Sequence, residues 1–411
     1  MYHKRILEER LKNSLGNHRI TVLIGPRQSG KTTLIKHIFN EVTEPKLYLD
    51  LDILENQEIF SSYNEVVRYL EFNGYRADKM FYLFLDEFQA LNDISRILKN
   101  LHDHHTKLKI FVTGSSSLEI LEKFKESLAG RKEIFYLYPL TFQEFLSFKD
   151  ETFAQKLESS SNSEIPLTIR RKLMSYLREA LIYGLYPEVA LTPDENEKKE
   201  IIRSIVDLFV KKDLISLLKM KNPQAALNIL RYIAINIGGV INYSDISATQ
   251  HIDLNTLKRY LLLLNETFIL KTVKPFFRNK NKEIVKAPKI YFVDAGIRNY
   301  FLKNFSPPEQ RPDIGFLAEN FALSQFLKRA DFLTEIKFWR DKNGREIDFV
   351  LQRENQIKAY EIKWKSRITI RDVANLEFFK KSYNEAKAFL VSPEKPNLGL
   401  GTIQEIDFFD L

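Results

Sequence analysis

The sequence predicts an α/β protein of several domains, on two observations. The chain has 411 residues, 44% of them hydrophobic and 28% charged, which is an ordinary composition for folded domains and enough for about three of them. Short apolar runs alternate with helical patterns through the first third of the chain, and such alternation is typical of a parallel sheet covered by helices on both faces.

Composition excludes several classes of protein. The chain has no cysteine, which excludes disulfides and Cys-ligated zinc and fits a reducing compartment. The stretch from Met1 to Glu8 lacks the apolar segment of a secretion signal, and no apolar run approaches the ~20 residues that cross a bilayer. We therefore expect a cytoplasmic protein without membrane contact. The net charge of +8 permits nucleic-acid binding but equally fits a lysine-rich surface that serves solubility.

The first expected domain covers residues 1–145 and contains five strands. A run of four to eight apolar residues bounded by polar segments is typical of a buried strand in a parallel sheet. The expected strands are Arg19 to Ile24, Lys46 to Asp50, Phe81 to Leu85, Leu108 to Thr113 and Glu133 to Leu137.

A phosphate-binding loop follows the first of these strands. Residues 25–32 match G-x-x-x-x-G-K-[ST] at every fixed position, between an apolar strand and a helix that begins at Thr32, as the motif requires. Its glycines let backbone N–H groups wrap a phosphate, and the helix N-terminus adds partial positive charge. We expect Lys31 to reach the β- and γ-phosphates and the Thr32 hydroxyl to bind Mg²⁺. The expected nucleotide-binding residues are Gly25, Pro26, Arg27, Gln28, Ser29, Gly30, Lys31, Thr32 and Thr33.

A second motif ends the third expected strand. The apolar run from Phe81 is followed by Asp86 and Glu87. A buried strand would deliver Asp86 to the metal, and Glu87 would polarise an attacking water. Because the phosphate-binding loop precedes it, this pair predicts hydrolysis of the nucleotide as well as binding. No guanine-recognition motif is present, so ATP is the expected nucleotide.

Two further positions in this domain carry alternatives. The strand from Leu108 should lie between those carrying the loop and the Asp-Glu pair, so a hydroxyl of Thr113 or Ser115 is placed to sense the γ-phosphate or hold the attacking water. A helix N-cap is the equal alternative for these hydroxyls. Arg131 is a candidate arginine finger for a neighbouring subunit of an oligomer, although a surface arginine is the commoner case.

These motifs resemble those of AAA+-related P-loop ATPases of bacteria and archaea. In that family an ATPase domain is fused to a C-terminal region of poorly known function. The resemblance rests on residues 25–34, Leu85-Asp86-Glu87, residues 113–117 and residues 128–131, and extends to residues 183–188 and 289–296. It therefore covers nearly the whole chain and implies ATP and Mg²⁺ as ligands.

The middle of the chain predicts a helical lid or linker at 146–222 and a winged helix at 223–305. Residues 158–164 read as a polar loop, followed by apolar stripes of helical spacing. In the second segment we expect helices near 229–237, 243–247 and 253–264, the last capped by Asp253, and then a β-hairpin.

Basic residues gather in the expected hairpin and the last helix. They are Lys258, Arg259, Lys271, Lys274, Arg278, Lys280, Lys282, Lys286 and Lys289. A basic wing could contact phosphates, with DNA favoured over RNA. The alternative is a winged helix that binds a protein partner or acts as a lid.

The last expected domain, residues 306–411, carries a nuclease-like pattern. Asp348 lies on one expected strand, and Glu361 and Lys363 lie on one face of the next. Two carboxylates and a lysine so placed can hold Mg²⁺ or Mn²⁺ and activate water for phosphodiester cleavage, with Glu319 as a further acidic ligand. The pattern resembles the PD-(D/E)xK nucleases, with Ile347 in place of the proline. The alternative is surface charge paired across a sheet.

Two main functional hypotheses follow, with a sequence-specific repressor gated by an ATPase as a third possibility. In one, ATP hydrolysis drives a DNA-binding, nuclease-like C-terminal region. In the other, the nucleotide switches the conformation of a scaffold for a protein partner, and the nuclease-like domain is inactive.

Overall fold

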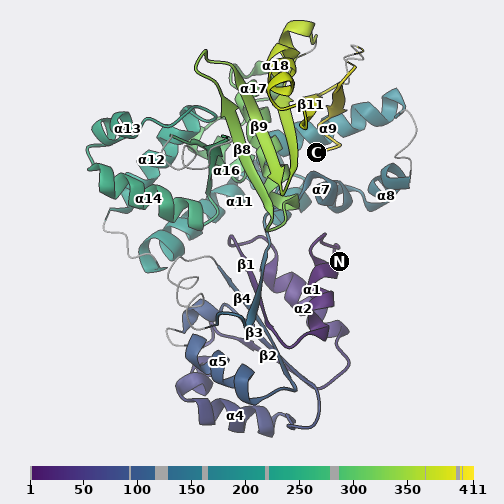
Figure 1. The fold of residues 1–411 in the computed structure, drawn as a ribbon. Helices are drawn as coiled ribbons and strands as arrows, with labels where there is room; N and C mark the ends of the chain where they lie inside the picture. Colours follow the sequence, from purple (N-terminus) through teal and green to yellow (C-terminus); the bar gives the residue numbers. More distant parts are fainter. Residues whose placement is uncertain are drawn as a thin grey trace. The chain divides into compact units, whose positions relative to one another are not determined.

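The computed structural model describes residues 2–91, 94–115, 128–159, 165–217, 222–277, 287–365, 367–394, 399 and 401–411. The chain divides into two compact units (Figure 1). Unit 1 consists of Met1–Pro139 with the short pieces Ser216–Leu218 and Glu266–Phe268. Unit 2 consists of Leu140–Ile215, Lys219–Asn265 and Ile269–Leu411. The expected lid, winged-helix and nuclease-like segments thus lie together in unit 2.

Unit 1 contains the expected parallel sheet. Its strands are ordered β2-β3-β4-β1-β5, and every neighbouring pair is parallel. They are β1 (Ile20–Gly25), β2 (Lys46–Asp50), β3 (Phe81–Asp86), β4 (Leu108–Ser115) and β5 (Lys132–Tyr136). As expected, β4 lies between β1, which leads into the phosphate-binding loop, and β3, which ends in Asp86.

Helices cover both faces of this sheet because the strand residues are apolar on both sides. On one face, α4 (Tyr63–Phe72) and α5 (Ile94–His104) contribute Leu70 and Leu98 to a core with Val22 of β1. On the other face, α1 (Glu8–Asn13) and α2 (Lys31–Glu41) contribute to a core that includes Leu34 and Leu23. The short helix α3 (Leu54–Glu58) follows β2.

Unit 2 is built on a mixed seven-stranded sheet of order β12-β11-β10-β9-β8-β6-β7. The strands are β6 (Leu270–Pro275), β7 (Lys289–Phe292), β8 (Thr334–Arg340), β9 (Glu346–Arg353), β10 (Gln356–Ile362), β11 (Lys387–Ser392) and β12 (Ile403–Asp407). The strands β8, β9 and β10 form an antiparallel meander, and β11 runs parallel to β10 after a crossover through α18 (Ala374–Ser382).

Helices make up the rest of unit 2 (Figure 1). They are α7 (Phe142–Lys149), α8 (Glu151–Ser159), α9 (Leu167–Tyr183), α10 (Pro187–Leu191), α11 (Glu195–Leu208), α12 (Pro223–Ile235), α13 (Tyr243–Gln250), α14 (Leu254–Glu266), α16 (Ala295–Leu302) and α17 (Ile314–Arg329). A π-helical segment, Phe209–Leu217, continues α11. Within the described ranges, no helix is both long and apolar enough to cross a membrane.

The segment expected to be a winged helix does contain three helices, α12, α13 and α14, followed by the antiparallel pair β6 and β7. Asp253 caps α14 as expected, since its Oδ1 accepts from the N–H groups of Asn255 and Thr256, both at 3.0 Å. The hairpin does not stand apart, however, because β6 also pairs in parallel with β8 and so extends the C-terminal sheet. The expected basic turn at 278–282 lies outside the described residues.

One basic residue of the expected wing is buried and not at the surface, contrary to the prediction. Lys289 is 2% exposed and pairs with Glu346 of β9, so it cannot contact a phosphate at the surface. The physical reason is that β7, the last strand of the sheet, is buried along its whole length, with α12, α16 and α17 packed against it. Lys258, Arg259 and Lys274 are exposed, as the prediction requires.

Candidate functional sites

The phosphate-binding loop is shaped by backbone conformations that favour glycine. At the end of β1, a Cβ on Gly25 would lie 2.1 Å from the backbone oxygen of Leu137, so only glycine fits. Gly30, with φ of 94°, precedes the first turn of α2. Lys31 begins that helix, and its Nζ donates to the backbone oxygens of Gly25 at 3.0 Å and Pro26 at 2.9 Å. The ammonium group therefore lies against the inner side of the loop.

A residue that the sequence pattern missed braces this loop. Arg5 is 4% exposed, and its guanidinium donates to the backbone oxygens of Ser29 and Tyr138, both at 2.8 Å. It therefore ties the loop to the segment after β5. Ser29 adds a bond within the loop, from its Oγ to the oxygen of Pro26 at 2.9 Å. Contacts made across such sequence distances leave no local motif that could have revealed Arg5.

The Asp86 carboxylate accepts several hydrogen bonds at the C-terminal ends of the parallel strands of unit 1. Its Oδ2 accepts from the hydroxyls of Thr32 and Tyr48, each at 2.7 Å. Its Oδ1 accepts from the Thr113 hydroxyl and from the N–H of Glu87, the latter at 3.1 Å. Asp86 is 1% exposed. Burial, and then the bond to Asp86, raises the pKa of the Tyr48 phenol. The parallel register places these groups at one edge of the sheet.

Glu87 follows in a left-handed conformation, with φ of 55° and ψ of 44°. A residue other than glycine holds this conformation only where its surroundings impose it, and such positions gather at functional sites. The side chain is partly exposed, so water can reach it. Gln89, in the 3₁₀ turn Phe88–Ala90, donates from Nε2 to Oε2 of Glu87.

The two hydroxyls at the end of β4 differ in their contacts. Thr113 is fully buried and bonds to Asp86. Ser115 is 2% exposed, and its Oγ has no hydrogen-bond partner among the described residues. The alternative of a helix N-cap involves residues 116–127, which lie outside the described residues. The geometry thus brings Thr113 to the Asp86 carboxylate, whereas Ser115, two residues further on, has a hydroxyl without a hydrogen-bond partner among the described residues.

Arg131 makes a bidentate ion pair within its own chain. Its Nε lies 2.6 Å from Oδ1 of Asp103 and its Nη2 lies 3.0 Å from Oδ2. The hydrogen bond from Arg131 is the main cause that lowers the pKa of Asp103 to about 2. This pairing fits the surface-arginine interpretation, because a guanidinium free to reach another subunit would have to break it.

In unit 2, the structure brings together the four residues of the nuclease-like pattern. Glu319 lies on α17, Asp348 on β9 and Glu361 on β10, with Lys363 directly after β10. Tyr360 is paired with Phe349 across the antiparallel strands, so Glu361 comes opposite Asp348. Asp348 and Glu361 are 7% and 4% exposed. They are thus mostly buried, unlike charges paired on a sheet surface.

Each of these carboxyl groups has a defined partner. Asp348 Oδ2 accepts from the N–H of Ile362 at 2.7 Å, and Glu361 Oε1 from Nζ of Lys363 at 2.5 Å. Glu361 Oε2 is buried with no partner in the described part of the chain. Burial, followed by the charge of Asp348, raises the pKa of Glu361 to about 8. Burial is also the main cause that raises the pKa values of Asp348 and Glu319.

The sequence pattern missed three residues that contact or adjoin these four. Tyr291 of β7 donates to Oε2 of Glu319 at 3.3 Å. Lys289 of β7 pairs with Glu346, which lies two residues before Asp348 on the same strand. We define the carboxylate cluster as Glu319, Glu346, Asp348, Glu361, Lys289 and Lys363. The strand period could have suggested Glu346, but only the pairing of β7 with the sheet brings in Lys289.

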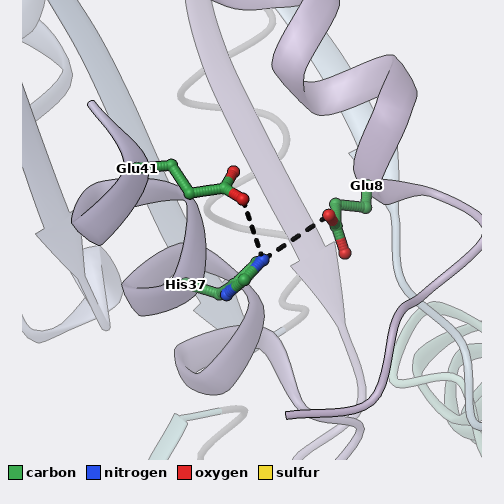
Figure 2. Close-up of side chains that lie close together, drawn as sticks. All are labelled: Glu8, His37 and Glu41. Carbon is green, nitrogen blue, oxygen red and sulfur yellow. Dashed lines mark ion pairs between the residues drawn. The ribbon is translucent and has the colours of Figure 1, made fainter. Parts of the chain in front are cut away.

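A different group has the ligand types of a metal site (Figure 2). In unit 1, Nε2 of His37 lies 3.6 Å from Glu8 Oε1 and 3.3 Å from Glu41 Oε1. Among the described residues, this trio alone brings three such ligand atoms within 4.8 Å of one another. However, Nζ of Lys12 lies 2.7 Å from both carboxylates. The ammonium group of Lys12 thus already neutralises these carboxylates in place of a metal ion. The four side chains link α1 to α2.

Two segments that also carry the family resemblance, residues 183–188 and 289–296, pack against each other. Asp294 is 3% exposed; its Oδ1 accepts from Gly296 N at 2.9 Å and its Oδ2 from Leu185 N at 2.7 Å. A Cβ on Gly184 would lie 2.0 Å from Asp294 Oδ1, and a Cβ on Gly296 would lie 2.1 Å from the oxygen of Tyr183. These glycines therefore allow the end of α9 to pack against the start of α16.

Comparisons with known proteins agree with the geometry of unit 1. Residues 17–146 match a family model described as an AAA domain. Residues 174–308 and 314–408 match two models described as domains of unknown function, DUF8612 and DUF4143.

Relatives match along most of the chain. An uncharacterised protein of Methanocaldococcus jannaschii is 25% identical over 359 residues, which are 86% of this chain and 76% of that protein. An uncharacterised protein of Haemophilus influenzae is 22% identical over 377 residues, 89% of this chain and 88% of that protein.

Among solved structures, the Walker-type ATPase paby2304 of Pyrococcus abyssi is 16% identical, with a TM-score of 0.49, and the match covers 73% of this chain and 96% of that one. The chain thus carries an AAA-type P-loop ATPase domain followed by segments that match two domains of unknown function.

Proposed function

We propose that the protein binds ATP with Mg²⁺ in unit 1 and hydrolyses it, and that turnover drives an action of unit 2 on nucleic acid. The observation that carries the proposal is the environment of Asp86. Its carboxylate accepts from the hydroxyls of Thr32 and Thr113, and Glu87 follows it in a left-handed turn open to water.

The residues present fit a magnesium ion. Thr32 and Asp86 supply a hydroxyl and a carboxylate oxygen within 2.7 Å of each other, and oxygen donors are the ligands that Mg²⁺ prefers. When bound with ATP, Mg²⁺ neutralises charge on the phosphate oxygens. In this proposal Lys31 exchanges the loop carbonyls for the β- and γ-phosphates.

Glu87 acts as the general base. An attacking water gives its proton to the Glu87 carboxylate while its oxygen forms a bond to the γ-phosphorus. The bond from that phosphorus to the bridging oxygen breaks, and ADP leaves with the electron pair. Among the other sequence candidates, Thr113 fixes Asp86, Ser115 is free to meet the phosphate or the water, and Arg131 stays bound to Asp103.

The second candidate function is metal-dependent phosphodiester cleavage at the carboxylate cluster. Four carboxyl groups and two ammonium groups share this largely buried place. If all six were ionised, two negative charges would remain in excess, and buried charge is costly unless it is neutralised. Protons or a divalent cation can neutralise it. Lys289 and Lys363 pair with Glu346 and with Oε1 of Glu361, so a cation would bind at Asp348, Glu319 and Oε2 of Glu361, with which no lysine pairs in the described part of the chain.

Nucleic-acid contact is proposed from the exposed basic residues Lys258 and Arg259 of α14 and Lys274 of β6. We keep the division into an ATPase domain at 1–145, a helical lid at 146–222, a winged helix at 223–305 and a nuclease-like domain at 306–411 as part of this proposal. An oligomer, with a partner subunit close to unit 1, is compatible with it.

The test is ATP turnover by the whole chain in Mg²⁺ or Mn²⁺, alone and with duplex or single-stranded DNA and RNA, with the integrity of the nucleic acid followed on a gel. Lys31→Ala should abolish ATP binding, and Lys79→Ala, which changes an exposed lysine of the same unit, should not. Asp348→Asn should abolish cleavage, and the exposed Glu354→Gln should not.

The outcomes separate the hypotheses. Turnover stimulated by nucleic acid, with cleavage lost in Asp348→Asn, supports both proposed activities. If nucleic acid does not change the rate of ATP turnover and every nucleic acid stays uncut, the proposed coupling of ATP hydrolysis to nucleic acid is wrong. The remaining hypothesis is then a nucleotide-dependent switch for a protein partner. ATP that binds without turnover would overturn hydrolysis.

A further inference from the structure

The 3₁₀ turn after β3 contains a glutamine to which the reaction described above assigns no role. Gln89 lies two residues after Glu87, and its Nε2 donates to Oε2 of Glu87. A backbone hydrogen bond closes the turn around this contact: the N–H of Ala90 donates to the backbone carbonyl oxygen of Glu87 at 3.0 Å. One oxygen of the Glu87 carboxylate is thus held by Gln89.

The other end of the Gln89 amide has no partner. Its Oε1 is buried and makes no hydrogen bond to any described residue. A buried polar atom left without a hydrogen bond destabilises the folded state, so an apolar side chain would fill the same space at a lower cost. A glutamine with only a structural role would satisfy both ends of its amide. Gln89 satisfies only the end that faces Glu87.

The unpaired oxygen lies beside the end of β4. A Cβ added to Gly114 would lie 2.6 Å from Gln89 Oε1 and 2.6 Å from Cε1 of Phe88. Gly114 therefore makes room for the glutamine. The next residue is Ser115, whose buried Oγ is also unpaired among the described residues. Successive side chains of a strand point to opposite faces, so Ser115 does not share this space, and the buried oxygen there belongs to Gln89.

We propose that Gln89 is the positioning residue for the catalytic base. Its amide N–H holds one oxygen of Glu87 and so aims the other at the attacking water. The inference rests on the proposed ATP hydrolysis and adds a residue to it. Gln89 exchanges no proton: the proton passes from water to Glu87, and the new and broken bonds to phosphorus are those described above.

The test compares kcat with ATP affinity in variants of the whole chain. Gln89→Met keeps a similar volume and removes both polar ends, and kcat should fall roughly 10- to 100-fold, the scale of a misplaced reacting group. ATP affinity should stay unchanged, and the unfolding temperature should not fall. Gln89→Glu keeps the shape but sets a second carboxylate against Glu87, so kcat should fall at least as far. This variant decides the matter if Gln89→Met does not fold.

The matched control is Gln57→Met in the same unit. The amide of Gln57 donates to the backbone oxygen of Leu51 at 2.7 Å, so the variant loses a glutamine amide hydrogen bond that does not involve Glu87, and kcat should not change. A wild-type rate in both Gln89 variants would overturn the inference alone. Equal losses of kcat and ATP affinity would also overturn it, because they would indicate a structural role. Absence of turnover in the wild type would overturn the proposed ATP hydrolysis itself, and this inference with it.

Discussion

Glu361 is a carboxyl group whose environment disfavours its charged form at neutral pH. Burial on β10, and then the charge of Asp348, raises its pKa from an ordinary 4.5 to about 8. The ammonium group of Lys363 opposes this change through a hydrogen bond and its charge. The residue therefore binds a proton more tightly in the folded chain than in the unfolded one.

This difference predicts how stability depends on pH. Between pH 4.5 and about 8 the folded state binds more protons at Glu361 than the unfolded state does, so its contribution to the free energy of unfolding falls as pH rises, by up to about 1.4 kcal/mol per unit. Glu361→Gln removes this contribution. The variant should therefore gain stability relative to the wild type from acidic to mildly alkaline pH, measured by urea unfolding of unit 2.

Lys363 loses its partner in Glu361→Gln, but this shifts the stability by an offset and not by a slope, since the lysine stays charged across the range. The exposed Glu354→Gln is the control and should leave the pH dependence as it is. A difference between Glu361→Gln and wild type that stays constant with pH would contradict the prediction.

At the residue scale, the sequence indicates groups that belong to a contiguous motif or to a strand period. Lys31, Thr32 and Asp86 lie at one edge of the sheet because strand, loop and helix follow each other directly. Arg5 and Tyr48 were missed since they act on this edge from distant segments, through a contact to backbone oxygens and a contact to a carboxylate. Neither contact involves residues close in sequence to Arg5 or Tyr48, so no local sequence motif could indicate it.

At the scale of elements, α16 depends on a buried cap. Asp294 accepts from Gly296 and Ile297 at the start of the helix and from Leu185 after α9. Asp294→Asn keeps the volume but replaces one acceptor with an N–H₂ group, which must then face a backbone N–H. We expect a loss of about 1–3 kcal/mol in the free energy of unfolding of unit 2, measured by chemical denaturation.

Asp253→Asn is the matched control, because it changes an exposed cap in the same way. A single oxygen of Asp253 accepts both N–H groups of α14, and asparagine retains that oxygen and is an equally good cap. Stability should then change by no more than a few tenths of a kcal/mol. Equal effects of the two substitutions would show that the buried contact to Leu185 contributes nothing.

The elements of unit 1 were predicted well because each strand is a bounded apolar run. The expected strand 46–50 coincides with β2, and the strand expected from Leu108 extends two residues beyond its predicted end, to Ser115. In unit 2 the hairpin was found, but its place in the seven-stranded sheet was not. That place depends on the pairing of Lys274 with Lys337, and strand order between distant segments has no local signal.

At the scale of the whole molecule, the two units have separate cores and separate candidate sites. The core clusters of the five-stranded sheet lie in unit 1, and the core around Ile347, Leu376 and Leu390 lies in unit 2. Each unit can therefore unfold as its own cooperative transition, and a ligand should stabilise the unit that binds it.

Calorimetry should then show two transitions that respond to different ligands. ATP with Mg²⁺ at about 100 times its Kd should stabilise unit 1 by about 2.7 kcal/mol and raise the midpoint of one transition. Mn²⁺ alone should raise the midpoint of the other by binding the carboxylate cluster. Lys31→Ala should lose only the first effect and Asp348→Asn only the second. A single transition would contradict this prediction. If either ligand alone raised the midpoint of that transition, the two units would unfold together, because a ligand bound in one unit would then stabilise the whole chain.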